Sequence, residues 1–274
     1  MRFRKGFSRS DLTVTVICVI FLVIGLGIVD GGARRRAKEA LCLSKLHKWG
    51  GLFHEYANDN DGKLMDYNYY DGEFMEHSWV PLMYSYHGDF DLCLCPSTTK
   101  TWRDHVWGGP YIGWDFRKIV EGEPSNWEWF PYYEVDGKRA YGSYGKNSWV
   151  ADSCDCDDNY HSHEYNYDNI YLLHTDEIPV LGDCEWAGGS PYIEDQPIEY
   201  EFRDTLFEGE GEINRFNLAR HGLSVNMCFL DWSARKVGLR ELWMLKWSRQ
   251  EGWGNTSVVP DPDEPSDWPE WMRD

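Results

Sequence analysis

The feature that most constrains this chain is an uncharged, apolar run from Leu12 to Val29 near its N-terminus. At about 1.5 Å of rise per residue, a helix over this run spans roughly 27 Å, close to the thickness of a bilayer's hydrocarbon core. Many of its residues are β-branched and form helices poorly in water, whereas in lipid a helix is the only single span that satisfies the backbone. The run therefore predicts a transmembrane helix over residues 12–29.

Two alternatives remain for the same run. One is a cleaved secretory signal peptide, with residues 31–33 as the small-residue cleavage site, although the run is longer than the usual apolar core of such peptides. The other is a plain signal anchor. Basic residues lie on both sides of the run, over positions 2–9 and 34–38, so the distribution of positive charge does not fix the orientation.

A specific arrangement precedes the apolar run. A short basic leader ends at Gly6, Phe7 follows it, and Asp11 is the fifth residue after that glycine. This arrangement resembles the N-terminus of type IV prepilins and type II secretion pseudopilins. The resemblance implies cleavage by a prepilin peptidase between Gly6 and Phe7, N-methylation of Phe7, and pairing of Asp11 with the terminal amine of a neighbouring subunit. The chain departs from the family in having Asp where Glu is usual and polar residues at 8–10.

Helical spacing continues after the apolar run. The residues at 42, 46, 49, 53 and 56 are Cys, Leu, Trp, Phe and Tyr, and they share one helical face. Joined to the apolar run, this pattern predicts one helix over 7–57, partly in the membrane and partly packed on a domain. Gly50–Gly51 allows a kink, and two separate helices meeting at residues 30–32 are the alternative.

Acidic residues form two candidate calcium sites. Asp59 and Asp61 match part of a calcium loop, but their segment, 58–62, also has the turn chemistry that ends a helix. The second candidate is an acidic stretch that is followed by two histidines, with a solvated surface loop as the alternative. Its acidic candidates are Asp152, Asp155, Asp157 and Asp158.

The C-terminal part contains the most regular β pattern. Residues 178–184 read as a buried strand, and residues 225–230 and 234–237 as two strands joined by a turn. Nine residues separate His221 from Asp231 at that turn. A histidine and an aspartate flanking a hairpin are either turn-fixing hydrogen-bond partners or an acid–base pair.

This spacing resembles the C-terminal His-x9-Asp-Gly motif of a pseudopilin-like family known chiefly from Planctomycetes and related bacteria, with Trp232 in place of the glycine. Segments 42–46, 56–62, 95–97 and 242–247 are also similar to that family. The resemblance assigns no chemistry to His221 and Asp231. It suggests a disulfide between Cys42 and Cys95.

Composition excludes some functions. A net charge of −19 argues against a nucleic-acid partner, because phosphate binding needs a basic surface. Seven cysteines lie outside the apolar run, and in an exported domain they favour disulfides; the Cys-x-Cys pairs are too tight for zinc knuckles. No hydrolase signature such as Gly-x-Ser-x-Gly or His-Glu-x-x-His is present.

Together these patterns predict an α+β, pilin-like fold in which a long N-terminal transmembrane and amphipathic helix packs on an antiparallel β-sheet with large irregular insertions. The expected divisions are a leader over 1–6, the helix over 7–57, a globular β domain over 58–254 and an acidic Pro/Trp tail over 255–274.

The predicted function is that of a non-enzymatic, pseudopilin-like subunit of a type II secretion or type IV pilus-like system. The resemblance implies other pilin-like subunits as partners and a single-pass inner-membrane location, with the bulk of the chain periplasmic or at the cell surface. The alternative is a membrane-anchored surface protein whose 15 Trp and 17 Tyr bind polysaccharide.

Overall fold

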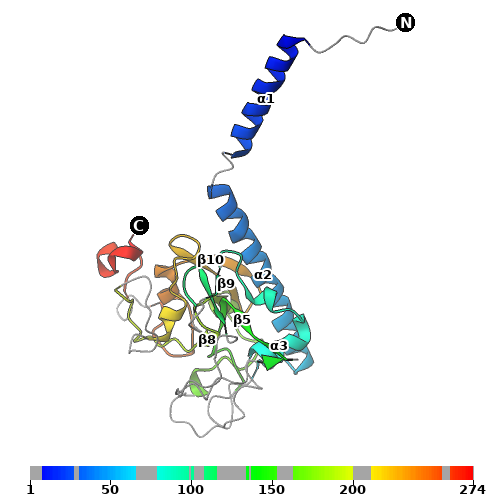
Figure 1. Cartoon of the computed structure of the whole chain (residues 1–274). Coiled ribbons are helices and arrows are strands. Elements are labelled where there is room, and N and C mark those ends of the chain that lie inside the picture. Colours follow the sequence, from blue (N-terminus) through cyan, green and yellow to red (C-terminus); the bar gives the residue numbers. More distant parts are fainter. Residues whose placement is uncertain are drawn as a thin grey trace, which may run out of the picture. The chain divides into compact units, whose positions relative to one another are not determined.

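The computed structural model divides the chain into two compact units, Met1–Lys38 and Glu39–Asp274. Figure 1 labels the elements of both units. The residues that the structure describes are 8–27, 31–65, 79–98, 100–101, 108–115, 134–135, 137–152, 163–199, 211–254 and 260–273.

The predicted single helix over 7–57 is wrong. The structure has two helices instead, α1 (Arg9–Gly27) and α2 (Gly31–Asp59), as Figure 1 shows. Two consecutive glycines open α2, and a glycine inside a helix costs about 1 kcal/mol relative to alanine. The chain therefore begins a new helix at Gly31, and none of the helices that the structure describes is the long apolar helix packed on a sheet that the pilin-like fold required.

The predicted membrane span is also wrong. None of the described helices is long and apolar enough to cross a membrane, which overturns both the span over 12–29 and the single-pass inner-membrane location. Helix α1 has 19 residues, but Arg9, Ser10 and Asp11 occupy its first turn. The apolar remainder is roughly 24 Å long, short of the roughly 30 Å hydrocarbon core.

Helix α2 buries the face that the sequence spacing predicts. Its buried side chains are Cys42, Leu46, Trp49, Phe53 and Ala57. Gly50–Gly51 lies within the helix and does not end it. The helix ends where the turn chemistry at 58–62 predicts, and the Gly62 amide, with a φ of +82°, donates to the Ala57 carbonyl at 2.7 Å. That hydrogen bond is typical of a helix C-terminus.

The central sheet has five strands in the order β10-β9-β7-β6-β8. The strands are β6 (Tyr144–Asn147), β7 (Pro179–Asp183), β8 (Gly188–Gly189), β9 (Ser224–Phe229) and β10 (Ala234–Gly238). The predicted buried strand at 178–184 and the predicted hairpin over 225–237 are confirmed as β7 and as β9–β10.

The central sheet is mixed, so the expectation of an antiparallel sheet is wrong at one edge. Strand β8 pairs in parallel with β6, whereas the other pairs are antiparallel. Glycine makes this pairing possible, because a Cβ on Gly188 would lie 2.8 Å from the Lys146 carbonyl oxygen.

Smaller elements surround the central sheet. A second sheet pairs β1 (Lys100–Thr101) in parallel with β2 (Ile112–Asp115), and β2 with β5 (Tyr141–Gly142); β3 (Glu134–Val135) and β4 (Lys138–Arg139) form a separate hairpin. The remaining α-helix is α3 (Trp79–His87). The described 3₁₀ turns are η1 (Phe90–Cys93), η3 (His163–Tyr165), η4 (Thr175–Glu177), η5 (Glu212–Arg215), η6 (Arg240–Met244), η7 (Pro265–Asp267) and η8 (Glu270–Met272).

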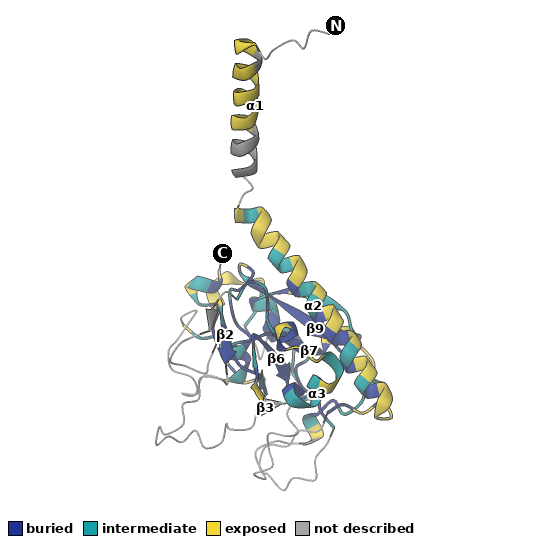
Figure 2. Cartoon of the chain, turned by 45° about the vertical axis from the view of Figure 1, so that its right-hand side comes forward, coloured by how far each residue is buried: buried dark blue, intermediate teal, exposed yellow. Residues whose placement is uncertain are grey.

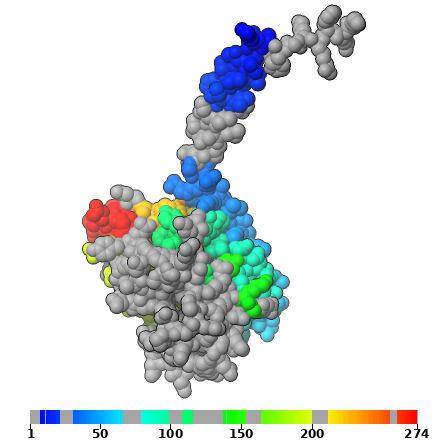
Figure 3. All heavy atoms as spheres, viewed as in Figure 1, coloured from blue at the N-terminus to red at the C-terminus, as the bar shows by residue number. Residues whose placement is uncertain are grey.

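Aromatic side chains fill the core of the second unit. Figure 2 shows the buried residues concentrated on the central strands and on one side of α2. The largest buried rings are Trp49, Trp114, Trp149, Trp243, Trp247 and Trp268. Trp268, in the predicted Pro/Trp tail, contacts Trp243 edge-on with ring centroids 5.2 Å apart. Figure 3 shows the described C-terminal residues, in red, as part of the surface of this unit.

Candidate metal centre

The two residues of the C-terminal motif lie at opposite ends of β9 and do not form an acid–base pair. Asp231 fixes the β9–β10 turn, because its carboxylate accepts a hydrogen bond from the Ser233 amide at 2.9 Å. His221 precedes β9 and points into the core, where its Nε2 lies 3.1 Å from Asp183 Oδ2. The motif therefore contributes a turn at one end of the strand and a buried histidine at the other.

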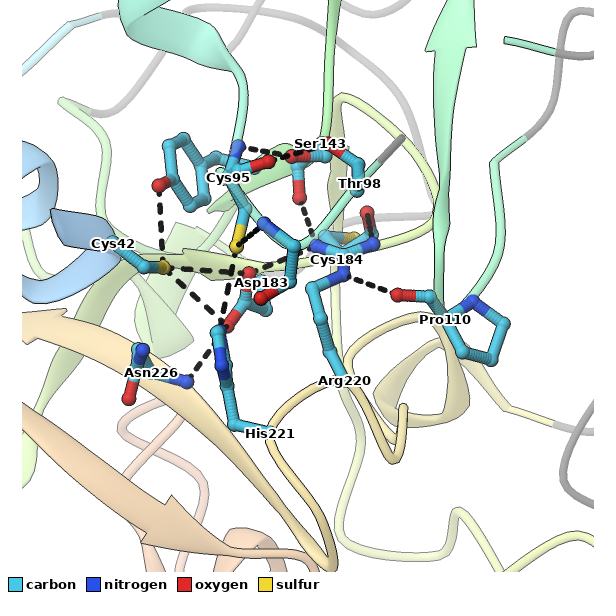
Figure 4. Close-up of polar contacts among 12 residues, drawn as sticks. Cys42, Cys95, Thr98, Pro110, Ser143, Asp183, Cys184, Arg220, His221 and Asn226 are labelled. Atoms are coloured by element: carbon cyan, nitrogen blue, oxygen red, sulfur yellow. Dashed lines mark hydrogen bonds and ion pairs between the residues drawn. The ribbon is translucent and has the colours of Figure 1, made fainter. Parts of the chain in front are cut away.

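Four side chains of the types that can ligate a metal converge between α2 and the central sheet. Cys42 comes from α2, Cys95 from the segment after η1, Asp183 from the last position of β7, and His221 from the segment before β9. Figure 4 shows these side chains pointing toward one another. One ligand atom from each lies within 4.8 Å of the others. All four residues are at most 2% exposed, so the cluster is closed to solvent.

Arg220 holds the Asp183 carboxylate in place. Its guanidinium donates to Asp183 Oδ1 at 2.9 Å, and the side chains of both residues are fully buried. The remaining guanidinium hydrogens go to the carbonyls of Pro110, Ser143, Gly109 and Cys184. All five N–H donors of the arginine are thus used. The backbone amide of Asn226 donates to the other carboxylate oxygen, Oδ2, at 2.8 Å.

Both sulfurs of the cluster accept hydrogen bonds. The Tyr144 hydroxyl donates to Cys42 Sγ at 3.2 Å, and the Ser97 amide donates to Cys95 Sγ at 3.4 Å. The Cys95 backbone is itself fixed, because its amide donates to the Ser143 hydroxyl at 2.7 Å. These contacts orient the two sulfurs and favour negative charge on them.

Burial and ionic partners set the charges of the cluster. Burial alone would raise the pKa of Asp183, but the Arg220 charge and the His221 hydrogen bond lower it to about 2. Burial alone would lower the pKa of His221, but its hydrogen bonds to Asp183 and Cys95 raise it to about 9. Without a metal, His221 is therefore an imidazolium at neutral pH.

The pKa values of the two cysteines shift in opposite directions. Burial raises the pKa of Cys42 well above its usual value, so Cys42 keeps its proton. Burial would also raise the pKa of Cys95, but a hydrogen bond from Cys42, a second with His221 and the Arg220 charge lower it to about 6. Cys95 is therefore a thiolate facing the His221 imidazolium, with their Sγ and Nε2 atoms 3.4 Å apart.

This arrangement can hold a metal ion, because two sulfurs, one imidazole nitrogen and one carboxylate are all accepted metal ligands. Neither Cys42 nor Cys95 forms a disulfide in the structure. Their proximity also permits oxidation, so the disulfide suggested by the family resemblance stays a prediction.

The predicted calcium residues lie elsewhere. Asp59 accepts a hydrogen bond from the Tyr86 hydroxyl at 3.3 Å, and Asp61 occupies the turn after α2 with a φ of +56°. Asp152 forms an ion pair with Lys63 at 2.9 Å. Asp155, Asp157 and Asp158 lie outside the described residues.

The structure describes only one of the three predicted processing residues. Gly6 and Phe7 lie outside the described residues, and Asp11 belongs to the first turn of α1. Prepilin cleavage and methylation stay predictions.

Sequence reasoning named three of the four cluster residues, though not as one group, and missed Asp183. Two signals pointed to it. Asp183 is a carboxylate at the end of an otherwise apolar buried strand, and Arg220 stands next to the histidine of the motif. A charged residue in a buried segment needs an opposite charge nearby.

Comparison of the chain with protein-family models, with curated proteins and with solved structures finds no match.

Proposed function

We propose that this chain is a pseudopilin-like structural subunit without catalytic activity, which assembles through α1 after the leader is removed. The observation that carries the proposal is the exposure of apolar side chains on α1. Seven large apolar residues of this helix are 46–70% exposed: Leu12, Val14, Val16, Ile17, Val19, Ile20 and Phe21. A helix that is apolar on all its sides is stable in a protein only when other elements cover it.

The occupant that fits α1 is the same helix of another subunit. Side-by-side packing of identical apolar helices buries their exposed surface without new polar partners, and the effect is worth about 25 cal/mol per Å² of apolar area. The basic leader ending at Gly6–Phe7 supports removal of residues 1–6 before assembly, as in the prepilins that this segment resembles.

The buried cluster supports a structural rather than a catalytic role. Its four ligand side chains are closed to solvent, and a substrate needs an open pocket. The aromatic side chains do not favour a second, polysaccharide-binding function. Six of the tryptophans that the structure describes are fully buried in the core, where a sugar cannot stack on them.

Calcium remains a proposal for the acidic residues alone. Calcium prefers a shell made wholly of oxygen ligands; Asp59 and Asp61 offer oxygen, whereas three of the four ligands of the buried cluster are sulfur or nitrogen. Calcium-dependent protection of the full-length chain against thermal unfolding is the measurement that tests it.

Two experiments test the proposed function. The first is the mass of the N-terminal peptide after co-expression with a prepilin peptidase; we expect N-methyl-Phe7, and an intact Met1 would contradict the processing step. The second uses Cys18, which is exposed on α1. Mild oxidation of the full-length chain should give a Cys18–Cys18 cross-linked dimer that the Cys18→Ser variant does not form.

A matched pair of variants distinguishes specific packing between α1 helices from non-specific association of the chains. Ile17→Lys places a charge on α1 and should abolish the Cys18 cross-link. Leu173→Lys changes a residue of the second unit that is 85% exposed and should leave the cross-link unchanged. A wild-type chain without the cross-link, or equal effects of both variants, would overturn assembly through α1.

A further inference from the structure

We propose that Cys42, Cys95, Asp183 and His221 bind one thiophilic divalent cation, for which Zn²⁺ is the best match, and that this ion fixes α2 to the central sheet. The proposal goes beyond the assembly function and is independent of it, because the cluster lies wholly within the second unit.

The spacing of the ligand atoms fits a tetrahedral ion. Zinc bonds of about 2.0–2.3 Å place neighbouring ligand atoms about 3.3–3.8 Å apart at tetrahedral angles. The nitrogen of His221 lies 3.1 Å from Asp183 Oδ2 and 3.4 Å from the sulfur of Cys95, and the sulfur of Cys42 lies 3.9 Å from the same Asp183 oxygen. Small side-chain rotations are enough to centre an ion among them.

The charge balance selects a divalent ion. With both cysteines as thiolates, the four ligands carry three negative charges. Arg220 supplies one positive charge from a fully buried side chain, so a divalent cation makes the group neutral. Neutrality is important here, because an uncompensated charge in a closed interior costs several kcal/mol. The donor set of sulfur, nitrogen and oxygen favours zinc over calcium or magnesium.

The surrounding contacts are those of a metal site with an ordered second layer. Asp183 is oriented by Arg220 and by the Asn226 amide, Cys42 Sγ accepts from Tyr144, and Cys95 Sγ accepts from the Ser97 amide. Such contacts fix ligand direction and strengthen binding at known metal sites. Three of the four ligands have at least one.

A buried, unpartnered amide adds an independent indication. The side chain of Asn226 is fully buried, and neither its Nδ2 nor its Oδ1 has a hydrogen-bond partner in the described part of the chain. This amide lies beside Cys42 (Figure 4). A metal-bound thiolate at Cys42 gives the orphaned N–H an acceptor, whereas the neutral thiol does not.

A metal and a disulfide exclude each other at this site, because a Cys42–Cys95 bond would consume both thiolates. The test therefore uses the full-length chain, fully reduced, unfolded in denaturant and refolded with Co²⁺ in place of Zn²⁺. Refolding in the presence of the ion removes the difficulty that a closed site is slow to exchange. We expect one Co²⁺ per chain, the visible absorption of tetrahedral cobalt and sulfur-to-cobalt charge transfer, all displaced by one equivalent of Zn²⁺.

Variants assign the signal to the cluster. Cys42→Ala and Asp183→Asn should each weaken cobalt binding at least tenfold. Cys228→Ala, which removes an equally buried thiol outside the cluster, should bind as the wild type does. Cobalt binding by the wild-type chain tests the proposal even if a variant fails to fold. Reduced, refolded chain without tetrahedral cobalt absorption, or absorption that Cys228→Ala removes as fully as Cys42→Ala, would overturn the proposal.

Discussion

The guanidinium of Arg220 donates to the carboxylate of Asp183 at 2.9 Å, and both side chains are completely buried. This pair places a full positive and a full negative charge at the junction of β7 with the segment before β9. In a closed interior neither charge is tolerable without the other. The arrangement of the cluster therefore depends on this pair whether or not an ion is bound.

Removal of one partner should be far more damaging than loss of a surface ion pair. We expect Arg220→Met to lower the free energy of unfolding by about 3–5 kcal/mol, because it leaves the Asp183 carboxylate buried without its counter-charge. Urea unfolding of reduced protein in chelator measures the effect. Lys63→Met, which breaks the exposed pair with Asp152, is the control and should unfold close to the wild type. Equal midpoints for the two variants would contradict the prediction.

In the reduced, metal-free chain, the protonation of His221 and that of Cys95 should change the free energy of unfolding in opposite directions as the pH rises. The pKa of His221 is raised to about 9, so its stabilisation is complete below about pH 6.5 and is lost as the pH rises through 9. The pKa of Cys95 is lowered to about 6, so its stabilisation is complete above about pH 8.5 and is lost as the pH falls through 6. Between about pH 6.5 and 8.5 the two slopes cancel.

Removal of Cys95 should leave the pH dependence of stability that comes from His221. In Cys95→Ala, His221 still faces Asp183, so the free energy of unfolding should fall as the pH rises above about 6.5, by up to about 1.4 kcal/mol per pH unit. Urea unfolding at half-unit steps measures it. Cys228→Ala, which leaves both groups in place, should keep the flat profile; a flat profile for Cys95→Ala as well would refute the cancellation.

The sequence predicted those elements whose signal is local. The buried face of α2 follows from helical spacing at residues 42–57, and the β9–β10 hairpin from two short apolar runs around a turn. The predicted helix over 7–57 failed because the glycines at 31 and 32 disfavour a helix interior, although the apolar spacing on both sides of them is helical. Their cost in a helix interior decides where α2 begins.

The candidate site could be predicted only in pieces. Cys42, Cys95, Asp183 and His221 come from four separate segments, and Cys42 and Asp183, whose side chains are in contact, are 141 residues apart along the chain. Each segment reads normally by itself, and nothing in its spacing says which other segment it meets. The parallel edge strand β8 escaped prediction for the same reason, because two glycines carry no periodicity.

The two adjacent glycines of α2 should respond oppositely to alanine. A Cβ on Gly50 would lie 2.9 Å from the Trp232 carbonyl oxygen and 3.1 Å from Cys228 Sγ, so Gly50→Ala should destabilise by about 1–3 kcal/mol through overpacking. Gly51 has nothing within 4 Å of that position, so Gly51→Ala should stabilise by about 0.5–1 kcal/mol through helix propensity. Urea unfolding of the two variants measures both effects. A shift in the same direction would refute the close approach of α2 to the β9–β10 turn.

Trp232 lies in the β9–β10 turn, at the position where the His-x9-Asp-Gly motif, which this region resembles, has glycine. Its φ of +67° lies in the left-handed region, which costs a residue with a side chain about 1–2 kcal/mol. The ring offsets part of this cost by stacking on His54, with centroids 5.6 Å apart and planes inclined by 18°. The comparison of Trp232→Gly with Trp232→Ala separates the two terms, because both variants lose the ring and only alanine retains the backbone strain.

We therefore expect the glycine variant at 232 to be more stable than the alanine variant by about 1 kcal/mol, measured by urea unfolding. The neighbouring Ser233, which is not among the described residues with positive φ, supplies the control. There the order should reverse, with Ser233→Ala more stable than Ser233→Gly by about 0.5–1 kcal/mol, because glycine gains more freedom in the unfolded chain. If alanine is the more stable substitute at both positions, the tryptophan is not held in a strained turn, and the glycine of the motif has some other cause.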